Sequence, residues 1–393
     1  MKPIIPNEEF KQRVLNTQKK MREKGLDLLL CYGNEAEPQF VRYYSDYWPS
    51  FESAAVLIPA DGEPFLLIGP ESLTYATSRS RIAKIRKVLA LRESSEPDYP
   101  GVSLKTFDDV IMEVTNGKAV KNIGIAGINL ITHTIYTVLE DALKKLGHIE
   151  IVKADNLVSE LRAIKSENEI ACLKEAYRIA QKAMKAVFDG IHVGMTENQV
   201  KAIAIKVVHD ENAEGEAYCS WVATGKGSNQ AISRLRGHEI KKGDMVQVGL
   251  SARYEGYAST MGRPVVMGKA NDEQIKMINA ALTVQKAILS TAKEGVPAKK
   301  ISEVHYETLK NLGCDKYILY GPCHGTGLME GEYPWIESNS TYDLKKGMTF
   351  CTCLYLGDDE NEVGIRVEDG FMITKNGTES FSDYRRELIE IDR

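Results

Sequence analysis

The feature that most constrains the fold is a repeat in the second half of the sequence. Within residues 166–210, two helical patterns are separated by a short turn that contains glycine. Residues 272–312 repeat this arrangement, with a similar turn at 294–297. Each pair of helices precedes a set of strands. This pattern predicts a duplicated α+β domain with a shared central sheet, in which a site between the two halves is natural.

The first part of the chain follows a different pattern. Helical and strand-like segments alternate, and a hairpin is expected around Asp61-Gly62, which predicts an α/β domain with a mixed sheet. Ser166 and Glu169 have the spacing of a capping box, which marks the start of a long helix just after the boundary. We therefore expect two domains, residues 1–160 and residues 161–393.

Composition excludes several classes of protein. The chain of 393 residues has 50 Lys and Arg against 55 Asp and Glu, which gives a net charge of −5. It lacks the surplus of basic residues that is typical of nucleic-acid-binding proteins, so we expect no nucleic-acid partner. No apolar run reaches the roughly 18 residues that span a bilayer, and the first residues do not resemble a signal peptide. The seven cysteines are odd in number and lack C-x-x-C spacing. We expect a cytoplasmic protein with reduced thiols, and no membrane partner.

Six short segments carry the most information about function. In chain order they are Leu161 to Ser166, Ile240 to Asp244, Tyr254 to Ser259, His324 to Leu328, Lys346 to Phe350 and Gly364 to Asp369. As an ordered set, they resemble the creatinase, prolidase and aminopeptidase P family. The resemblance covers nearly the whole chain. It implies an α/β N-terminal domain followed by an α+β domain with the pita-bread fold.

The resemblance also implies a homodimer. In related dimers, a segment of the N-terminal domain reaches the partner's cleft, and here that segment contains Tyr47, Trp48 and Phe51. Packing of these aromatic residues in the core of their own domain is an equally good interpretation.

Peptidases of that family hold two metal ions with two Asp, one His and two Glu, and the resemblance implies where these ligands would lie. Gly249 and Thr260 stand at the two aspartate positions, and Cys353 stands at the first glutamate position. Only His324 and Glu368 keep the expected residue type. Because bridging carboxylates hold the two cations together, we expect the two-metal chemistry to be lost. We expect no metal and no other cofactor.

Creatinase is a metal-free member of the family, so the loss of metal need not remove activity. Its histidine base corresponds to Ile232 here, and a carboxylate that orients its substrate corresponds to Gly262. This chain therefore departs from creatinase as well. His238 lies on the same loop as Ile232 and could substitute if the loop were rearranged; a solvated histidine beside a turn is the simpler interpretation.

The predicted catalytic set is His324, Cys353 and Glu368. An imidazole can act as a general base near neutral pH, and leftover packing is the alternative for His324. Cys353 could be a nucleophile, a zinc ligand together with His324 and Glu368, or a small apolar filler. Glu368 could orient the imidazole, bind a cationic group, or form a buried ion pair with Arg366.

Four further residues are predicted to contact the substrate, because their segments border the family's cleft. They are Tyr257, Arg263, Glu332 and Arg366. Glu330 and Trp335 lie in the same segments. Gly331 replaces the family's second active-site histidine, which removes a group that contacts the substrate carbonyl in the peptidases.

Three functions follow from these observations. The first is a hydrolase that acts on a C–N bond of a small amide-, amidine- or guanidine-like metabolite without a two-metal centre, as creatinase does. The second is an Xaa-Pro dipeptidase or aminopeptidase of the same family. The third is a catalytically silent protein that binds a small molecule or a peptide. In the first reading, the only expected partners are a small-molecule substrate and a second copy of the chain.

Overall fold

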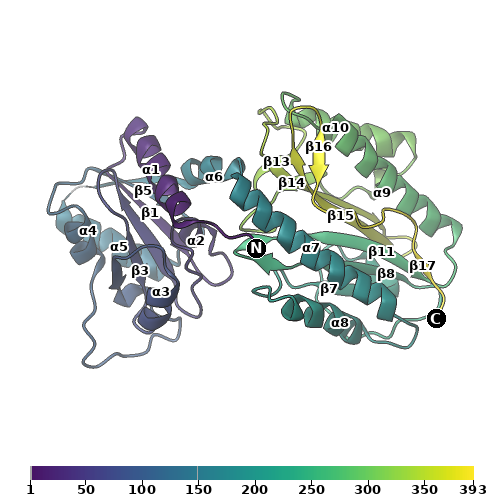
Figure 1. Cartoon of the computed structure of the whole chain (residues 1–393), viewed down its shortest axis with the longest axis horizontal. Coiled ribbons are helices and arrows are strands. Elements are labelled where there is room, and N and C mark those ends of the chain that lie inside the picture. Colours follow the sequence, from purple (N-terminus) through teal and green to yellow (C-terminus); the bar gives the residue numbers. More distant parts are fainter. Residues whose placement is uncertain (1, 148) are drawn as a thin grey trace. The chain divides into compact units, whose positions relative to one another are not determined.

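The structure, a computed structural model, describes residues 2–147 and 149–393. It divides into two compact units (Figure 1). One comprises Ile5–Arg162, and the other comprises Ala163–Arg393 together with the short N-terminal segment up to Ile4. Helix α6 (Asp155–Ala163) ends at this division. No helix in the described part of the chain combines the length and the apolar character that crossing a membrane requires.

The N-terminal unit contains a six-stranded sheet in the order β4-β3-β2-β1-β5-β6. Strand β1 (Leu28–Gly33) pairs antiparallel with β2 (Ala54–Pro59) and parallel with β5 (Asn122–Ala126). The outer strands are β3 (Phe65–Ile68), β4 (Ile85–Lys87) and β6 (Glu150–Lys153). The predicted mixed sheet is thus confirmed.

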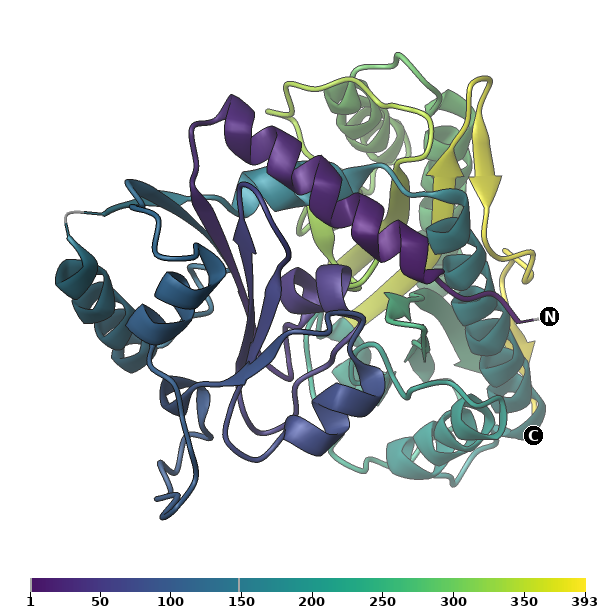
Figure 2. The same cartoon turned by 60° about the vertical axis from the view of Figure 1, so that its left-hand side comes forward.

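Helices cover both faces of this sheet. They are α1 (Asn7–Glu23), α2 (Gln39–Ser45), α3 (Leu73–Arg79), α4 (Phe107–Val114) and α5 (His133–Leu146). Alternate residues of β1, such as Leu28 and Leu30, share a core with α4 and α5, because neighbouring side chains of a strand point to opposite faces. Figure 2 shows the purple helix α1 on one side of the sheet, and α4 and α5 on the other.

The C-terminal unit contains the two predicted pairs of helices. The first pair is α7 (Glu167–Gly190) and α8 (Glu197–Asp210), and the second is α9 (Asp272–Thr291) and α10 (Ala298–Asn311). The Ser166 side chain caps α7, and Glu169 returns the bond to the backbone of Ser166, so the predicted capping box is present. Helix α7 packs against β8 and β11, and α9 packs against β14 and β15.

A nine-stranded sheet connects the two halves of this unit, and its main order is β13-β12-β14-β15-β11-β8-β7. These strands are β7 (Trp221–Thr224), β8 (Met245–Leu250), β11 (Met261–Met267), β12 (Cys323–Gly325), β13 (Glu332–Ile336), β14 (Thr349–Asp358) and β15 (Val363–Ile373). Short strand β16 (Thr378–Ser380) pairs with β15, and β17 (Glu390–Ile391) pairs with β11. Strands β9 (Arg253–Tyr254) and β10 (Tyr257–Ala258) form a separate hairpin. Strands from both halves therefore meet in one sheet.

His305 gives the C-terminal unit a pH-dependent stability. It lies on α10 and is 5% exposed, and burial lowers its pKa to about 4. The unfolded chain, in which histidine titrates near 6.5, takes up this proton first. Stability from the neutral imidazole is therefore present above pH 6.5 and is lost as the pH falls towards 4.

We predict that His305→Leu removes this loss. Between pH 7 and pH 4.5, the unfolding free energy of the native chain should fall by about 2 kcal/mol more than that of the variant. Urea unfolding at several pH values measures the difference. Parallel curves for the two proteins would contradict the prediction.

Candidate functional site

The candidate site is built on one row of residues that crosses five strands of the large sheet. Cys353 on β14 pairs with Glu368 on β15, and Glu368 pairs with Gly262 on β11. Gly262 in turn pairs with Gly249 on β8, and Gly249 pairs with Trp221 on β7. Residues directly opposite one another in a sheet project from the same face, so this row forms one continuous surface.

Trp221 occupies the space beside Gly249. A Cβ atom added to Gly249 would lie 2.9 Å from Cε2 of the indole, closer than real side chains approach. A Cβ added to Gly262 would likewise lie 3.0 Å from Oε2 of Glu368. The two glycines therefore admit their neighbours' side chains, and the aspartate that the family places at position 249 would collide with Trp221.

A cavity of about 350 Å³ lies beside this row. Aromatic, acidic, basic and sulfur-bearing side chains line it. They are Tyr218, Trp221, Tyr320, Cys323, His324, Glu330, Trp335, Glu337, Cys353 and Arg366, together with Ala231, Ile232 and Gly321. His324, Cys353 and Arg366, which come from the predicted set, are thus brought together at one cavity. Glu368 is not part of its lining but lies opposite Cys353 on the neighbouring strand.

His324 is held as a cation. Its Nε2 lies 3.3 Å from Oε1 of Glu330, and its Nδ1 lies 3.0 Å from the carbonyl oxygen of Gly325. Burial alone would lower the pKa of His324, but hydrogen bonds to the Cys353 sulfur and to the Glu330 carboxylate outweigh burial and raise this pKa well above its usual value. Burial would raise the pKa of Glu330, but His324 and Arg366 hold it below its usual value. The two side chains therefore form an imidazolium–carboxylate pair near neutral pH.

Glu368 is the centre of a second, more deeply buried group. Its Oε1 accepts from the Cys353 thiol at 3.1 Å and from a guanidinium nitrogen of Arg366 at 2.8 Å. The guanidinium lies 4.8 Å from the centre of the Trp221 ring system, which places a cation over an aromatic face. Within the described chain, Oε2 of Glu368 has no hydrogen-bond partner. The buried ion pair between Glu368 and Arg366, one of the expected alternatives, is therefore present.

Cys353 is a protonated thiol in this environment. The side chain is 8% exposed, and burial together with the Glu368 carboxylate raises its pKa above the ordinary value, against the opposing effect of His324 and Arg366. A nucleophilic cysteine needs a lowered pKa. The geometry therefore does not support the expectation of a nucleophile, and the thiol instead acts as a hydrogen-bond donor to Glu368.

The residues present do not fit the metal centre that the family implies. Of the five ligand positions, Gly249 offers no donor atom, and Glu368 has one oxygen already bound to Arg366 and Cys353. In the part of the chain that the structure describes, no group of three or more His, Cys, Asp and Glu side chains could hold a metal ion. The geometry likewise does not support a single zinc ion on His324, Cys353 and Glu368.

Three of the predicted substrate-binding residues lie outside the cavity lining, which corrects the expectation that they face it. Tyr257 donates to Glu169 at 2.7 Å, and Lys165 donates to Glu332 at 2.8 Å. Arg263 binds both oxygens of Asp369 at 2.9 Å. Arg263 follows Gly262 on β11, so it projects from the opposite face of the sheet. Of the four, only Arg366 lines the cavity.

The structure also shows where the two residues of the creatinase-like loop, Ile232 and His238, lie. Ile232 lines the cavity and is 93% exposed, whereas the side chain of His238 is half-exposed and lies 3.7 Å from Glu197. His238 therefore does not take the place of a catalytic histidine here. Sequence reasoning overlooked Trp221, Tyr320 and Glu337 as cavity residues. None of the three belongs to a family motif. For Trp221 the one available signal was Gly249, because a glycine leaves space for a bulky side chain on the neighbouring strand.

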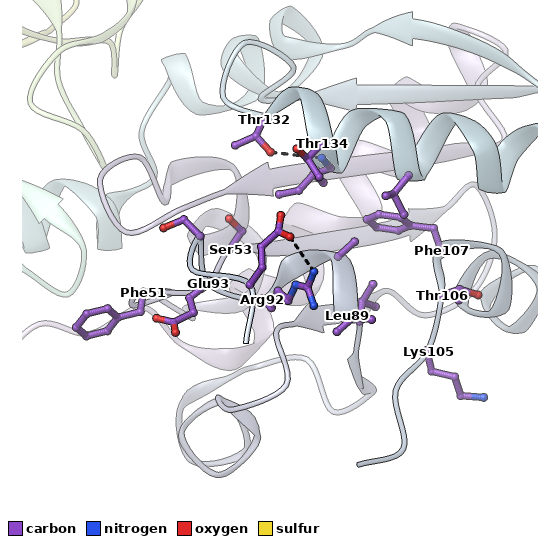
Figure 3. Close-up of a pocket in the computed structure, with 16 residues that line it drawn as sticks. Phe51, Ser53, Leu89, Arg92, Glu93, Lys105, Thr106, Phe107, Thr132 and Thr134 are labelled. Atoms are coloured by element: carbon purple, nitrogen blue, oxygen red, sulfur yellow. Dashed lines mark hydrogen bonds and ion pairs between the residues drawn. The ribbon is translucent and has the colours of Figure 1, made fainter. Parts of the chain in front are cut away.

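A second cavity, of about 410 Å³, lies in the N-terminal unit (Figure 3). Apolar and hydroxyl side chains dominate its lining, and Arg92 pairs there with Glu96 at 3.1 Å. Phe51 lies at its edge and is 85% exposed, while Tyr47 is buried. The described lining of this cavity contains no histidine and no cysteine, whereas His324 and Cys353 line the cavity in the C-terminal unit, which is therefore the candidate site.

Two family profiles match the chain. Residues 171–375 match metallopeptidase family M24, and residues 13–164 match the creatinase/prolidase N-terminal domain. An Xaa-Pro dipeptidase of Pyrococcus furiosus is 28% identical over 97% of this chain and all of its own length. A second Xaa-Pro dipeptidase, from Pyrococcus horikoshii, is 30% identical over 68% of this chain and 76% of its own length.

Solved structures agree with these matches. A prolidase from Pyrococcus horikoshii superposes with a TM-score of 0.82 at 26% identity and covers 96% of this chain and all of its own. An X-Pro aminopeptidase from Thermotoga maritima superposes with a TM-score of 0.83 at 23% identity and covers 96% of this chain and 99% of its own. At this identity the match shows a similar fold. The chain belongs to the creatinase, prolidase and aminopeptidase P family, with a creatinase/prolidase N-terminal domain followed by an M24 domain of pita-bread fold.

Proposed function

We propose that this protein is a hydrolase that cleaves a C–N bond in a small amide-, amidine- or guanidine-like substrate without a two-metal centre. One observation carries the proposal. Three of the family's five metal-ligand positions have lost their metal-binding residue type, and two of them, Gly249 and Cys353, lie in the row that crosses the sheet. Charged groups suited to proton transfer nevertheless remain in the cavity and beside it. C–N bond cleavage is also the reaction that the name Xaa-Pro dipeptidase implies for the relatives.

The charged groups divide into a proton donor and a proton acceptor. His324, held as a cation by Glu330, would give a proton to the leaving nitrogen. Glu368, whose Oε2 has no partner within the described chain, would take a proton from the attacking water. Water oxygen then bonds to the substrate carbon, the C–N bond breaks, and both protons are accounted for.

Arg366 and Cys353 would support these two groups. The Arg366 guanidinium lines the cavity and carries a fixed positive charge, which suits the negative charge that develops on a carbonyl oxygen during attack. The Cys353 thiol donates a hydrogen bond to Oε1 of Glu368, which leaves Oε2 of the same carboxylate as the proton acceptor. In this role Cys353 positions the base and forms no covalent intermediate.

An Xaa-Pro dipeptide is the second candidate substrate, and the names of the relatives favour it. The altered ligand positions count against the metal-dependent form of that reaction. Among the matches described above, the name creatinase belongs to the N-terminal domain, so the proposal of a guanidine substrate rests on the site. A silent binding protein is the outcome if no substrate of any class is turned over.

We predict that the purified protein contains far less than one tightly held divalent metal ion per chain, and that a chelator leaves its turnover unchanged. Elemental analysis and a panel of amides, amidines, guanidines and Xaa-Pro dipeptides provide the measurements. Two retained metal ions, together with cleavage of Xaa-Pro dipeptides that a chelator abolishes, would defeat the proposal in favour of the conventional peptidase.

Substitutions separate the proposed roles. His324→Gln and Glu368→Gln should each lower kcat by about 10²–10⁴-fold, because each removes one proton transfer. Cys353→Ala should stay within about tenfold of the native enzyme, because a positioning thiol is less important than the groups that exchange protons. Steady-state kinetics on folded variants measure the effects. Loss of activity in Cys353→Ala alone would point to a nucleophilic cysteine, and unchanged turnover in all three variants would show that the site is wrong.

The contact between Trp221 and Gly249 gives a prediction about stability. Gly249→Asp should cost about 1–3 kcal/mol of unfolding free energy, because the new side chain collides with the indole. In a Trp221→Ala background the cost should shrink by at least about 1 kcal/mol. Gly377→Asp is the matched control, since no atom lies within 4 Å of its added Cβ. Equal costs of Gly249→Asp in both backgrounds, measured by urea unfolding, would rule out the coupling.

A further inference from the structure

The charges around the cavity in the C-terminal unit cancel in pairs, with one exception. His324 is paired with Glu330, and Arg366 is paired with Glu368. Each pair joins one positive and one negative group, so the two pairs together add no net charge to the cavity. Glu337 is the remaining charged residue of the lining. The cavity therefore carries one uncompensated negative charge.

The carboxylate of Glu337 is available to a ligand. Within the described residues it forms no hydrogen bond or ion pair, and the side chain is only partly buried. It lies over Gly321, where an added Cβ would come 2.5 Å from Oε2. Any larger residue at position 321 would displace the carboxylate. The glycine thus leaves room for a charged group that the protein itself does not neutralise.

Aromatic rings form the walls near this charge. Tyr218, Trp221, Tyr320 and Trp335 all line the cavity, and Trp335 is 51% exposed. One of these rings already carries a cation, because the Arg366 guanidinium lies 4.8 Å from the centre of Trp221. An aromatic wall with a single free carboxylate favours a compact organic cation, which gains from the ring faces and from the opposite charge.

We infer that this cavity binds a small organic monocation, with its ammonium group placed against Trp335 and Tyr320 and near the Glu337 carboxylate. The inference rests on the proposed function, because it assigns a positively charged group to the substrate of the proposed hydrolase. Glu337 is then a residue that determines specificity, separate from His324 and Glu368, which transfer protons.

The test compares two probes of equal shape and different charge. Choline and its neutral carbon isostere, 3,3-dimethyl-1-butanol, are titrated into the full-length protein by calorimetry. We expect choline to bind at least about tenfold more tightly than the alcohol. Glu337→Gln should weaken choline binding by about fivefold and leave binding of the alcohol unchanged. Trp335→Leu should weaken choline binding as well.

Glu307→Gln is the matched control, because it removes the same charge from an exposed position on α10 that does not line the cavity. It should leave choline binding unchanged. Equal affinity for the two probes, absence of choline binding, or a Glu307→Gln effect as large as that of Glu337→Gln would overturn the inference. Turnover of neutral amides without choline binding would leave the proposed hydrolase intact. Choline binding with the expected pattern, but no turnover of any substrate, would defeat the hydrolase and keep the cation site.

Discussion

The buried ion pair between Arg366 and Glu368 is the interaction on which the site depends. Glu368 is 1% exposed and lies in the middle of the row that crosses the sheet. A buried carboxylate without a compensating charge is costly, and removal of one partner from such a pair typically costs about 3–5 kcal/mol. In metal-dependent relatives of this kind, cations can supply that charge. Here the guanidinium supplies it, and Cys353 adds a neutral hydrogen bond.

The rest of the row adjusts to this arrangement. Gly262 leaves space for the Glu368 carboxylate, and Gly249 leaves space for Trp221. Trp221 in turn supports the Arg366 guanidinium through its ring face. The two glycines of the row are therefore connected, since each admits a side chain that belongs to the ion pair or to its aromatic support. Reinstating a single aspartate would disturb this packing without creating a metal site.

Much of the fold followed from local patterns in the sequence. Three features depend on residues that are close together in the chain: the capping box of Ser166 and Glu169, the repeated helix pairs and the hairpin at Asp61-Gly62. The sequence was therefore sufficient to predict them. Helix α2 (Gln39–Ser45) was not predicted, because it has only seven residues and all of them, including the polar Gln39, Arg42 and Ser45, are buried.

The site was only partly predictable, for a physical reason. His324, Cys353 and Glu368 were found because motifs place them, and the charged partners Glu330 and Arg366 are close to them in sequence. Trp221, whose ring supports the Arg366 guanidinium, comes from a distant segment. Tyr257 and Arg263 belong to the same motifs, yet their side chains bind Glu169 and Asp369 away from the cavity. Strand register decides which face each residue occupies, and a one-residue step reverses that face. Sequence spacing alone does not reveal it.

Anomalous diffraction from crystals soaked in manganese tests the central claim most directly, because it reports metal at the site itself. The claim is that Arg366, and no metal ion, neutralises Glu368. We expect no anomalous peak between His324 and Glu368, and the guanidinium in place beside the carboxylate. A pair of peaks about 3.5–4 Å apart at these side chains, with Arg366 displaced, would contradict the account.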